Sequence, residues 1–264
     1  MPHTKGEKPV DLFITGYGNN GIWNIPYSFL FLFLIAGLWC IGQLIGFVGA
    51  VYLNPELSGF FADVLSGNPE RIEALAFNGE VVWPTALVGG IFGISAVFLC
   101  VRFKKGSKIK DYLALNIPDI KQVLLWIGIM ILFLFSFEYA AKFFPDLESD
   151  FMQKVMESTT KPVMLLISIG IIAPIFEELI FRGFLYKGLE QSRLGPHAAV
   201  WITSILFAII HTQYSLSIVI LIIPMALVMG YSRMYTKSIW TPILLHIFNN
   251  SLTTIIALSE LEVI

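Results

Sequence analysis

The sequence predicts an all-α fold, a polytopic bundle of about seven to eight transmembrane helices. Of the 264 residues, 56% are hydrophobic and only 14% are charged, whereas an average soluble domain has roughly 25% charged residues. The mean hydropathy is +0.75. The apolar residues are gathered into runs, several of them near the length of about 20 that a helix needs to cross a bilayer core. This composition excludes a disordered chain and an ordinary soluble enzyme.

Charge and cysteine content narrow the function classes further. The formal net charge is -2 at pH 7, so the sequence predicts no nucleic-acid partner. The two cysteines, Cys40 and Cys100, lie inside apolar runs, which excludes a disulfide framework and a cysteine-rich metal site. We expect both to be small packing residues. We also expect no cofactor and no bound metal.

Seven apolar runs are interpreted as membrane spans. In chain order they cover Tyr27 to Leu53, Trp83 to Val101, Val123 to Phe144, Val163 to Leu189, Ala198 to His211, Ser217 to Tyr231 and Ile239 to Leu258. An eighth helix, short and amphipathic, is the alternative for the segment from Leu53 to Trp83. We expect one domain in three parts: a cytoplasmic lead-in over 1–26, N-terminal transmembrane helices over 27–162 and a C-terminal core over 163–264.

Small residues predict that the first two spans pack closely. Gly42 and Gly46 lie four residues apart in the first span, and Gly89 and Gly93 have the same spacing in the second. Small residues at this spacing let helix backbones approach one another in membranes. We interpret both pairs as packing signals without a role in function.

The third span contains an ionisable pair, Glu138 and Lys142, one helical turn apart near its end. Residues at this spacing share a helix face and can pair, and long charged side chains near a helix end reach the membrane interface. We therefore expect these two residues to pair with each other or to extend to the interface.

The loops predict an orientation in the membrane. The 102–122 loop contains six Lys or Arg residues, and the 187–197 and 232–238 loops contain two each. Cytoplasmic loops are enriched in these residues, and alternating spans place all three loops on one side. The sequence therefore predicts a cytoplasmic N-terminus and an external C-terminus. The short loops favour a bacterial plasma membrane.

The fourth span contains two adjacent glutamates in the segment 173–183, APIFEELIFRG. Glu178 and Arg182 are one turn apart, so they share a helix face and can form an ion pair. Glu177 points about 100° away and is not satisfied by that pair. An ionisable group within a span is costly and marks a functional candidate, so Glu177 is a candidate general base. The alternative is that both glutamates only solvate the cytoplasmic end of the helix.

The fifth and seventh spans add two histidines and an asparagine. His211 follows Phe207 by four residues, and Asn250 follows His246 by four. Alone, His211 fits an interfacial histidine, and the pair in the seventh span fits a hydrogen bond between helices. Together with Glu177 they are most of the polar groups predicted within the membrane in the second half of the chain. Because buried polar groups need partners, we expect them to converge on one water-filled cavity suited to hydrolysing an amide bond.

These motifs, in this order, resemble the CPBP family of CAAX prenyl endopeptidases and bacteriocin-processing or self-immunity membrane proteins. The motifs are Glu177-Glu178-x-x-x-Arg182, Phe207-x-x-x-His211 and His246-x-x-x-Asn250, within a resemblance that covers about residues 163–258. The resemblance implies an intramembrane glutamate endopeptidase with a catalytic core in its last four helices. It also implies that Glu178 and Arg182 hold the site in shape.

The resemblance implies roles for the other motif residues as well. Glu177 would activate a water molecule with the help of His211, and His246 and Asn250 would form the oxyanion hole. The implied substrate is a membrane-associated protein, a prenylated CAAX-type protein or a peptide precursor. The expected partners are membrane lipids and this peptide or lipidated-protein substrate.

Three alternatives remain open from the residues. Glu177, His211 and His246 could bind zinc in a membrane metalloprotease, although the sequence has no His-Glu-x-x-His motif. The chain could instead be a non-catalytic membrane immunity or binding protein of the same family. A proton-coupled transporter is the third alternative, with Glu138, Glu177 and the histidines as a relay.

Strict alternation of the spans separates the candidate residues in depth. It places Glu177 in the middle of its span, His246 nearer the cytoplasm and His211 towards the outer end. A common site therefore requires the fifth span to be tilted, broken or shifted, which is tolerated where a helix lines a cavity.

Overall fold

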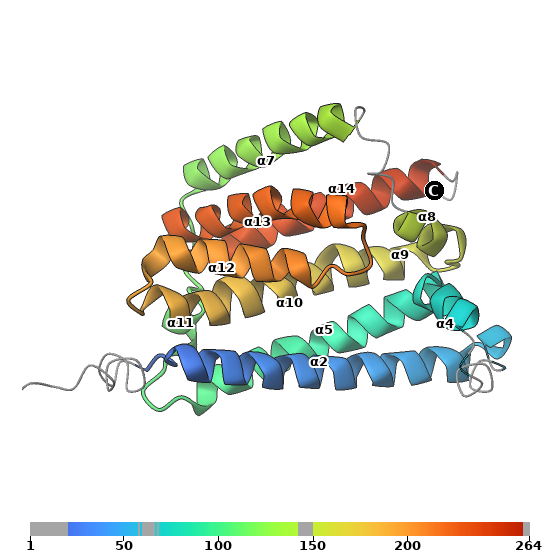
Figure 1. Ribbon diagram of the computed structural model, residues 1–264, viewed down its shortest axis with the longest axis horizontal. Coiled ribbons are helices and arrows are strands. Elements are labelled where there is room, and N and C mark those ends of the chain that lie inside the picture. Colours follow the sequence, from blue (N-terminus) through green and yellow to red (C-terminus); the bar gives the residue numbers. More distant parts are fainter. Residues whose placement is uncertain (1–20, 58, 60–66, 68, 142–149, 261–264) are drawn as a thin grey trace, which may run out of the picture.

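The structure is a computed structural model that describes residues 21–57, 59, 67, 69–141 and 150–260. This part of the chain forms helices and connecting loops, with no strand among the described residues, and the helices lie side by side as a bundle (Figure 1). The predicted all-α class is confirmed.

Six helical stretches of the described chain are long and apolar enough to cross a membrane. They are α2 (Ile25–Leu53), α5 (Gly79–Phe103), α7 (Ile120–Ala141), the continuous stretch Pro162–Glu190, α13 (Leu216–Thr236) and α14 (Trp240–Glu260). They correspond to six of the seven predicted spans. The sixth span extends beyond its predicted end at Tyr231, and the predicted end of the third at Phe144 lies outside the described residues.

The stretch Pro162–Glu190 is not a uniform α-helix. It consists of α9 (Pro162–Leu165), η3 (Leu166–Ile172), α10 (Ala173–Glu178), η4 (Leu179–Leu185) and α11 (Tyr186–Glu190). Both η3 and η4 are π-helical. The adjacent glutamates therefore lie between two segments that are wound more widely than an α-helix.

The predicted fifth span is a shorter helix, α12 (Gly195–Ile209), with 15 residues. At 1.5 Å per residue it is about 22 Å long, which is less than the roughly 30 Å of a hydrocarbon core. The remaining short elements are η1 (Pro55–Leu57), α4 (Pro69–Ala76), α6 (Ile109–Tyr112) and α8 (Asp150–Glu157). The segment considered for an eighth helix thus contains α4, whose 8 residues are too few to span a bilayer.

The glycines of the first two spans allow α2 and α5 to pack closely, as predicted. A Cβ added to Gly42 would lie 2.7 Å from the Cβ of Phe92 and 3.0 Å from the Cα of Gly89. Gly93 leaves room for the ring of Phe176 in α10, which a Cβ at this position would overlap. Gly42 therefore allows α2 to pack against α5, and Gly93 allows α5 to pack against the helix that carries the glutamates.

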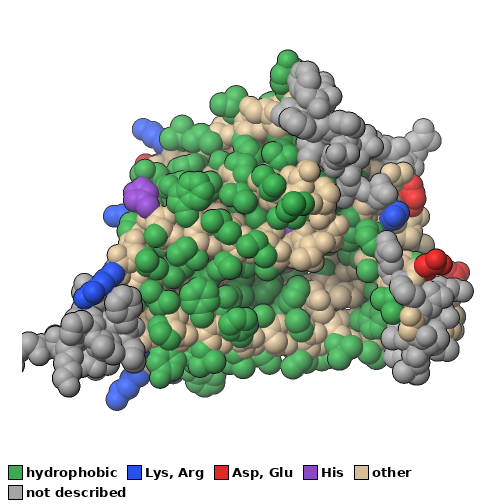
Figure 2. All heavy atoms as spheres, in the orientation of Figure 1, with side chains coloured by type: hydrophobic (Ala, Val, Ile, Leu, Met, Phe, Trp, Pro, Cys, Tyr) green, Lys and Arg blue, Asp and Glu red, His purple; other side chains and the backbone are tan. Residues whose placement is uncertain are grey.

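The two ends of the bundle differ in charge. We call the end where α5, α11 and α13 finish the basic end, and the end where α5 begins and α14 finishes the acidic end (Figure 1). Figure 2 shows mostly Lys and Arg side chains at one end and mostly Asp and Glu side chains at the other. The loops of the basic end contact one another, since Ile239 N–H donates to the Ala114 carbonyl over 3.0 Å.

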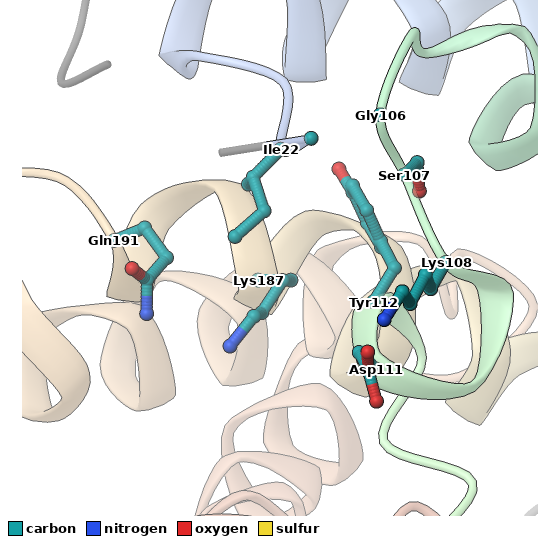
Figure 3. Close-up of a pocket in the computed structure, with 9 residues that line it drawn as sticks. Ile22, Gly106, Ser107, Lys108, Asp111, Tyr112, Lys187 and Gln191 are labelled. Carbon is teal, nitrogen blue, oxygen red and sulfur yellow. The ribbon is translucent and has the colours of Figure 1, made fainter. Parts of the chain in front are cut away.

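A pocket of about 360 Å³ lies at the basic end, beside the start of α2 and the loop after α5 (Figure 3). Its wall includes the side chains of Lys108, Asp111, Tyr112 and Lys187. None of the motif residues is among the described residues that line it. The candidate site therefore lies elsewhere, deeper in the bundle.

Candidate active site

Two π-helical hydrogen bonds frame the helix that carries the glutamates. The N–H of Ala173 donates to the carbonyl of Ser168 in η3, and the N–H of Tyr186 donates to that of Phe181 in η4. Each bond reaches back five residues instead of four. Such turns within α-helices are rare and often occur at functional sites.

Pro174 accounts for the first of these turns. Proline has no N–H, so it cannot donate to the carbonyls of Ile169 and Gly170 that precede it. Two side chains of α14 replace the missing donor: Asn250 Nδ2 lies 3.1 Å from the Ile169 oxygen, and Ser251 Oγ lies 3.3 Å from the Gly170 oxygen. A buried carbonyl without a donor costs about 1–3 kcal/mol. The proline thus makes α14 a necessary neighbour of the site helix.

The second turn is held by Arg233 of α13. Its Nε donates to the backbone carbonyl of Arg182 over 3.1 Å, and its guanidinium lies 5.0 Å from the centre of the Tyr186 ring. Arg233 is only 3% exposed. Side chains from two different helices therefore fix the backbone on both sides of α10.

Glu178, Arg182 and His246 form a buried charged cluster. Arg182 Nη1 lies 3.1 Å from Glu178 Oε1, and His246 Nδ1 lies 2.9 Å from the same oxygen. The side chains of Glu178 and Arg182 are 0% exposed and that of His246 is 2% exposed. Because an ionised carboxylate only accepts hydrogen bonds, Nδ1 of His246 carries a hydrogen. The ion pair expected between Glu178 and Arg182 is present.

Glu177 faces the other nitrogen of the same imidazole. Its Oε2 lies 3.7 Å from His246 Nε2, and its side chain is 21% exposed. This separation is longer than a hydrogen bond but close enough for a strong electrostatic interaction in a low-dielectric interior. Two adjacent glutamates therefore approach the two ring nitrogens of one histidine, one from inside the core and one from its edge.

The ring of Phe207 connects the second motif to this cluster. Its centroid lies 4.7 Å from that of His211 and 5.5 Å from that of His246, and the guanidinium of Arg182 lies 4.5 Å from it. The Nδ1 of His211 lies 2.7 Å from the Phe207 carbonyl. Because that oxygen only accepts, Nδ1 of His211 carries a hydrogen and donates it.

Strict alternation of full-length spans would place His211 and Glu177 at different depths in the membrane. The short length of α12 removes this conflict. The helix ends at Ile209, about 22 Å from its start at 1.5 Å per residue, so His211 lies within the bundle. The fifth span is therefore shorter than predicted, whereas the alternatives considered were a tilted, broken or shifted span. Among the described contacts, the histidine that meets Glu177 is His246, and His211 reaches the cluster through Phe207. Asn250 is bound to the backbone of η3 on the neighbouring turn.

Tyr214 is a residue of the site that motif analysis did not single out. It lies in the loop after α12, with its ring stacked on His211 at a centroid distance of 6.3 Å and an interplanar angle of 10°. Burial, followed by the nearby negative charge of Glu177, raises the pKa of Tyr214 to about 12. Its hydroxyl is therefore neutral and able to donate a hydrogen bond. The only sequence signal was an aromatic residue three positions after the motif histidine.

Glu138 lies on α7, outside the helices that form this cluster. Glu138 is exposed on α7, and Lys142 lies outside the described residues, so their pairing stays a prediction. Within the described part of the chain, no three His, Cys, Asp or Glu side chains gather as a metal-binding group. The alternative zinc set of Glu177, His211 and His246 is thus not assembled in this arrangement.

Comparison with known proteins supports the resemblance drawn from the motifs. Residues 159–252 match the family model described as Type II CAAX prenyl endopeptidase Rce1-like. A protein of Bacillus subtilis (strain 168) named "Putative membrane peptidase YdiL" is 29% identical over 115 residues, which is 44% of this chain and 46% of that protein. The chain thus matches about half the length of this curated relative. No solved structure matches the chain significantly.

The match includes all three motifs, and the resemblance to CPBP membrane proteases is confirmed over this segment. Together with the apolar helices, it identifies the chain as an integral membrane protein that is related, at the level of the family, to membrane proteases.

Proposed function

We propose that this protein is an intramembrane endopeptidase that hydrolyses a peptide bond of a membrane-associated substrate, with Glu177 as the general base. The observation that carries the proposal is the position of the His246 imidazole between Glu178 and Glu177, at 2.9 Å and 3.7 Å. The Glu178 carboxylate is fully buried and forms an ion pair with Arg182. The other is partly exposed and has no ion pair with a Lys or Arg among the described residues, so it can act on a water molecule.

The charges of the cluster suggest its active protonation state. Arg182 is positive and Glu178 is negative, so one proton shared by Glu177 and His246 makes the four groups neutral together. With that proton on His246, the Glu177 carboxylate is a base and the His246 Nε2–H is a donor. This state combines a proton acceptor and a positioned cation in one site.

Hydrolysis would then proceed in two steps. The water oxygen attacks the scissile carbonyl carbon while its proton passes to Glu177, and the proton then moves from Glu177 to the leaving amine nitrogen as the C–N bond breaks. In its neutral form, His211 can accept at Nε2 a hydrogen bond from the second O–H of the attacking water, which stays on the oxygen of the product carboxyl group. The oxyanion would be stabilised by His246 Nε2–H, and Asn250 retains one N–H beyond that used on Ile169. Preorganised donors of this kind contribute about 2.7–4 kcal/mol each to transition-state stabilisation.

The proposal is tested by comparing the wild-type protein with Glu177→Gln in liposomes. Each is incubated with peptides that carry apolar segments, including a prenylated CAAX peptide, and the products are read by mass spectrometry. Glu138→Gln is the matched control, since it removes an exposed carboxylate on α7. We expect cleavage by the wild type and the control, and none by Glu177→Gln.

Three outcomes would contradict the proposal. Equal cleavage by Glu177→Gln and the wild type would remove Glu177 from the mechanism. Loss of cleavage on adding a metal chelator, restored by zinc, would favour the metalloprotease alternative. If the wild type cleaves none of the peptides and Glu177→Gln leaves the cellular phenotype unchanged, the non-catalytic binding role is the better interpretation.

A further inference from the structure

We propose that the pocket at the basic end binds the phosphate headgroup of an anionic glycerophospholipid. The pocket has a volume of about 360 Å³, within the roughly 300–1,000 Å³ of most small-molecule sites. None of the motif residues lines it, so the proposal does not depend on proteolysis. It follows from the position of the pocket at the ends of three spans, from the groups in its wall and from the charge of the surrounding loops.

The pocket lies where the spanning helices begin and end. Gly21 and Ile22 come just before the first residue of α2, and residues 106–112 follow the last residue of α5. Lys187 and Gln191 lie at the end of the stretch Pro162–Glu190 and directly after it. Figure 3 shows side chains of these three segments around the pocket. A pocket bordered by the ends of spanning helices lies at the surface of the membrane, where the lipid headgroups are.

Aromatic side chains at the start of α2 indicate the same depth. Trp23 Nε1 donates to the Cys100 carbonyl over 3.0 Å, and the Lys104 ammonium lies 4.8 Å from the centre of the Trp23 ring. The nearby Tyr27 is 49% exposed. Trp and Tyr gather at the boundary between the hydrocarbon core and the headgroups. Because Ile22 in the wall directly precedes Trp23, the pocket borders headgroups and not acyl chains.

The loop after α5 offers two donors to a phosphate oxygen. The side chain of Lys108 is exposed and forms no ion pair within the described part of the chain. The Oγ of Ser107 is buried, and no hydrogen-bond partner for it lies among the described residues. Buried polar groups of native proteins almost always have a partner, and a hydroxyl can donate. A phosphate oxygen in the pocket would supply the partner that Ser107 lacks.

A second ammonium group comes from α11. Lys187 Nζ lies 2.9 Å from Glu190 Oε2, and its side chain is 18% exposed. This pair holds the ammonium in place and leaves it further N–H donors for a ligand. Asp111 is the acidic group among the described residues of the wall. A carboxylate accepts hydrogen bonds from hydroxyl groups, so Asp111 suits a headgroup that carries hydroxyls beside its phosphate.

The loops around the pocket carry an excess of positive charge. The segments 102–122, 187–197 and 232–238 together contain ten Lys or Arg residues and three Asp or Glu residues. Basic clusters next to spanning helices attract anionic lipids, and basic pockets between such helices bind phosphate headgroups. The charge therefore favours an anionic lipid over a zwitterionic one.

A ligand in this pocket would connect the loop after α5 to the end of the helix that carries the glutamates. Tyr112 in the wall is 2% exposed, and its ring stacks on that of Phe184 in η4 at a centroid distance of 5.6 Å. Lys187 lies on the turn that follows η4. Because a ligand that binds only the folded state stabilises it, we expect the lipid to raise the thermal unfolding midpoint.

The test measures lipid binding to the full-length protein, delipidated in detergent, by native mass spectrometry and by thermal unfolding. The ligands are short-chain phosphatidylglycerol, short-chain phosphatidylethanolamine, glycerophosphoglycerol as the same headgroup without acyl chains, and inorganic phosphate. The pocket variant combines Lys108→Gln with Lys187→Gln. Its control combines Lys105→Gln with Lys110→Gln, which removes the same charge from exposed side chains outside the pocket wall.

We expect phosphatidylglycerol to bind the wild type and the control, and the pocket variant to bind it about 10-fold more weakly or worse. Lys108→Gln alone, at an exposed position, and Ser107→Ala should each weaken binding in a protein that stays folded, which keeps the test valid if the double variant unfolds. A lack of binding to the folded wild type would overturn the proposal.

The other arms identify the ligand. An equal loss of affinity in the control would show a diffuse basic surface and overturn the pocket as the site. Equal binding of phosphatidylethanolamine would overturn the preference for an anionic lipid. If glycerophosphoglycerol or inorganic phosphate binds as tightly as phosphatidylglycerol, a soluble phosphate compound is the ligand and the lipid assignment is overturned.

Discussion

The Nδ1 of His246 lies 2.9 Å from Oε1 of Glu178, although the two residues are separated by 68 positions in the chain. The bond fixes the plane of the imidazole and leaves its second nitrogen directed at Glu177. Glu178 thus orients the histidine, and Glu177 faces the second nitrogen of the same ring. A carboxylate that orients a histidine in this way is a recurrent device in hydrolytic sites.

Glu178→Gln should severely destabilise the protein. The substitution keeps the size of the side chain but leaves the buried Arg182 without its counter-charge, and breaking a buried pair costs about 3–5 kcal/mol. Glu190→Gln is the control, because its pair with Lys187 at 2.9 Å is partly exposed, and such pairs contribute about 0–1 kcal/mol. The measurement is the thermal unfolding midpoint in detergent. Equal midpoints for both variants would show that Glu178 and Arg182 do not stabilise the core.

Pro174→Ala should lower activity without lowering stability. Alanine restores the missing N–H, so the helix can return to α-helical hydrogen bonding and rotate Glu177 away from His246. Alanine also avoids the cost of about 3 kcal/mol for proline within a helix. Pro224→Ala in α13 is the control, since this proline is also inside a helix but is exposed. Cleavage rate and unfolding midpoint are measured for both, and full activity in Pro174→Ala would contradict a role for the π-helical turn.

Tyr214→Phe should lower kcat and leave KM nearly unchanged. The ring stays stacked on His211, and only the hydroxyl that is electrostatically coupled to Glu177 is lost, so we expect a loss of about 10-fold, equivalent to about 1.4 kcal/mol. Since the pKa of Tyr214 is raised to about 12, its hydroxyl stays neutral below that value. The wild type and the variant should therefore have the same alkaline limb in their pH–rate profiles. Tyr235→Phe, at an exposed position of α13, should match the wild type, and a similar kcat in Tyr214→Phe would exclude the hydroxyl from the reaction.

Gly93→Ala should destabilise the contact between α5 and α10. The added Cβ would overlap the ring of Phe176, and overpacking of this kind costs about 1–3 kcal/mol. Gly37→Ala provides the matched control, because no atom lies within 4 Å of its added Cβ. Alanine is favoured over glycine in a helix by about 1 kcal/mol, so this control should be slightly stabilised. Unfolding midpoints that change in the same direction would contradict the packing role of Gly93.

The sequence predicted most of the helices and the composition of the cluster. Hydrophobic length alone located the six long stretches, because crossing a bilayer requires a run that few other structures need. Spacing along one helix was equally informative for Glu178 and Arg182, since residues four apart share a helix face. The contacts of Gly42 with Phe92 likewise agree with the small-residue pattern.

Other features depend on contacts between distant segments and left no local pattern. The motif analysis assigned Asn250 to an oxyanion hole, and that role remains untested. The structure adds that its amide replaces the hydrogen bond that Pro174 cannot donate. Arg233 is a second example. The sequence predicted that it lies in a positively charged loop, whereas in the structure it is buried and donates to the carbonyl of Arg182.

The sequence by itself determined that this chain is a helical membrane protein and which polar side chains must be satisfied within the bundle. Composition and periodicity settle these points because the cost of exposing backbone or charge to lipid depends only on local chemistry. The tertiary structure decided that His246, and not His211, meets Glu177. It also decided that α12 stops short of the acidic end and that the ring of Tyr214 stacks on His211. These relationships depend on how far each helix extends past its neighbours, which is set by packing between residues far apart in the chain.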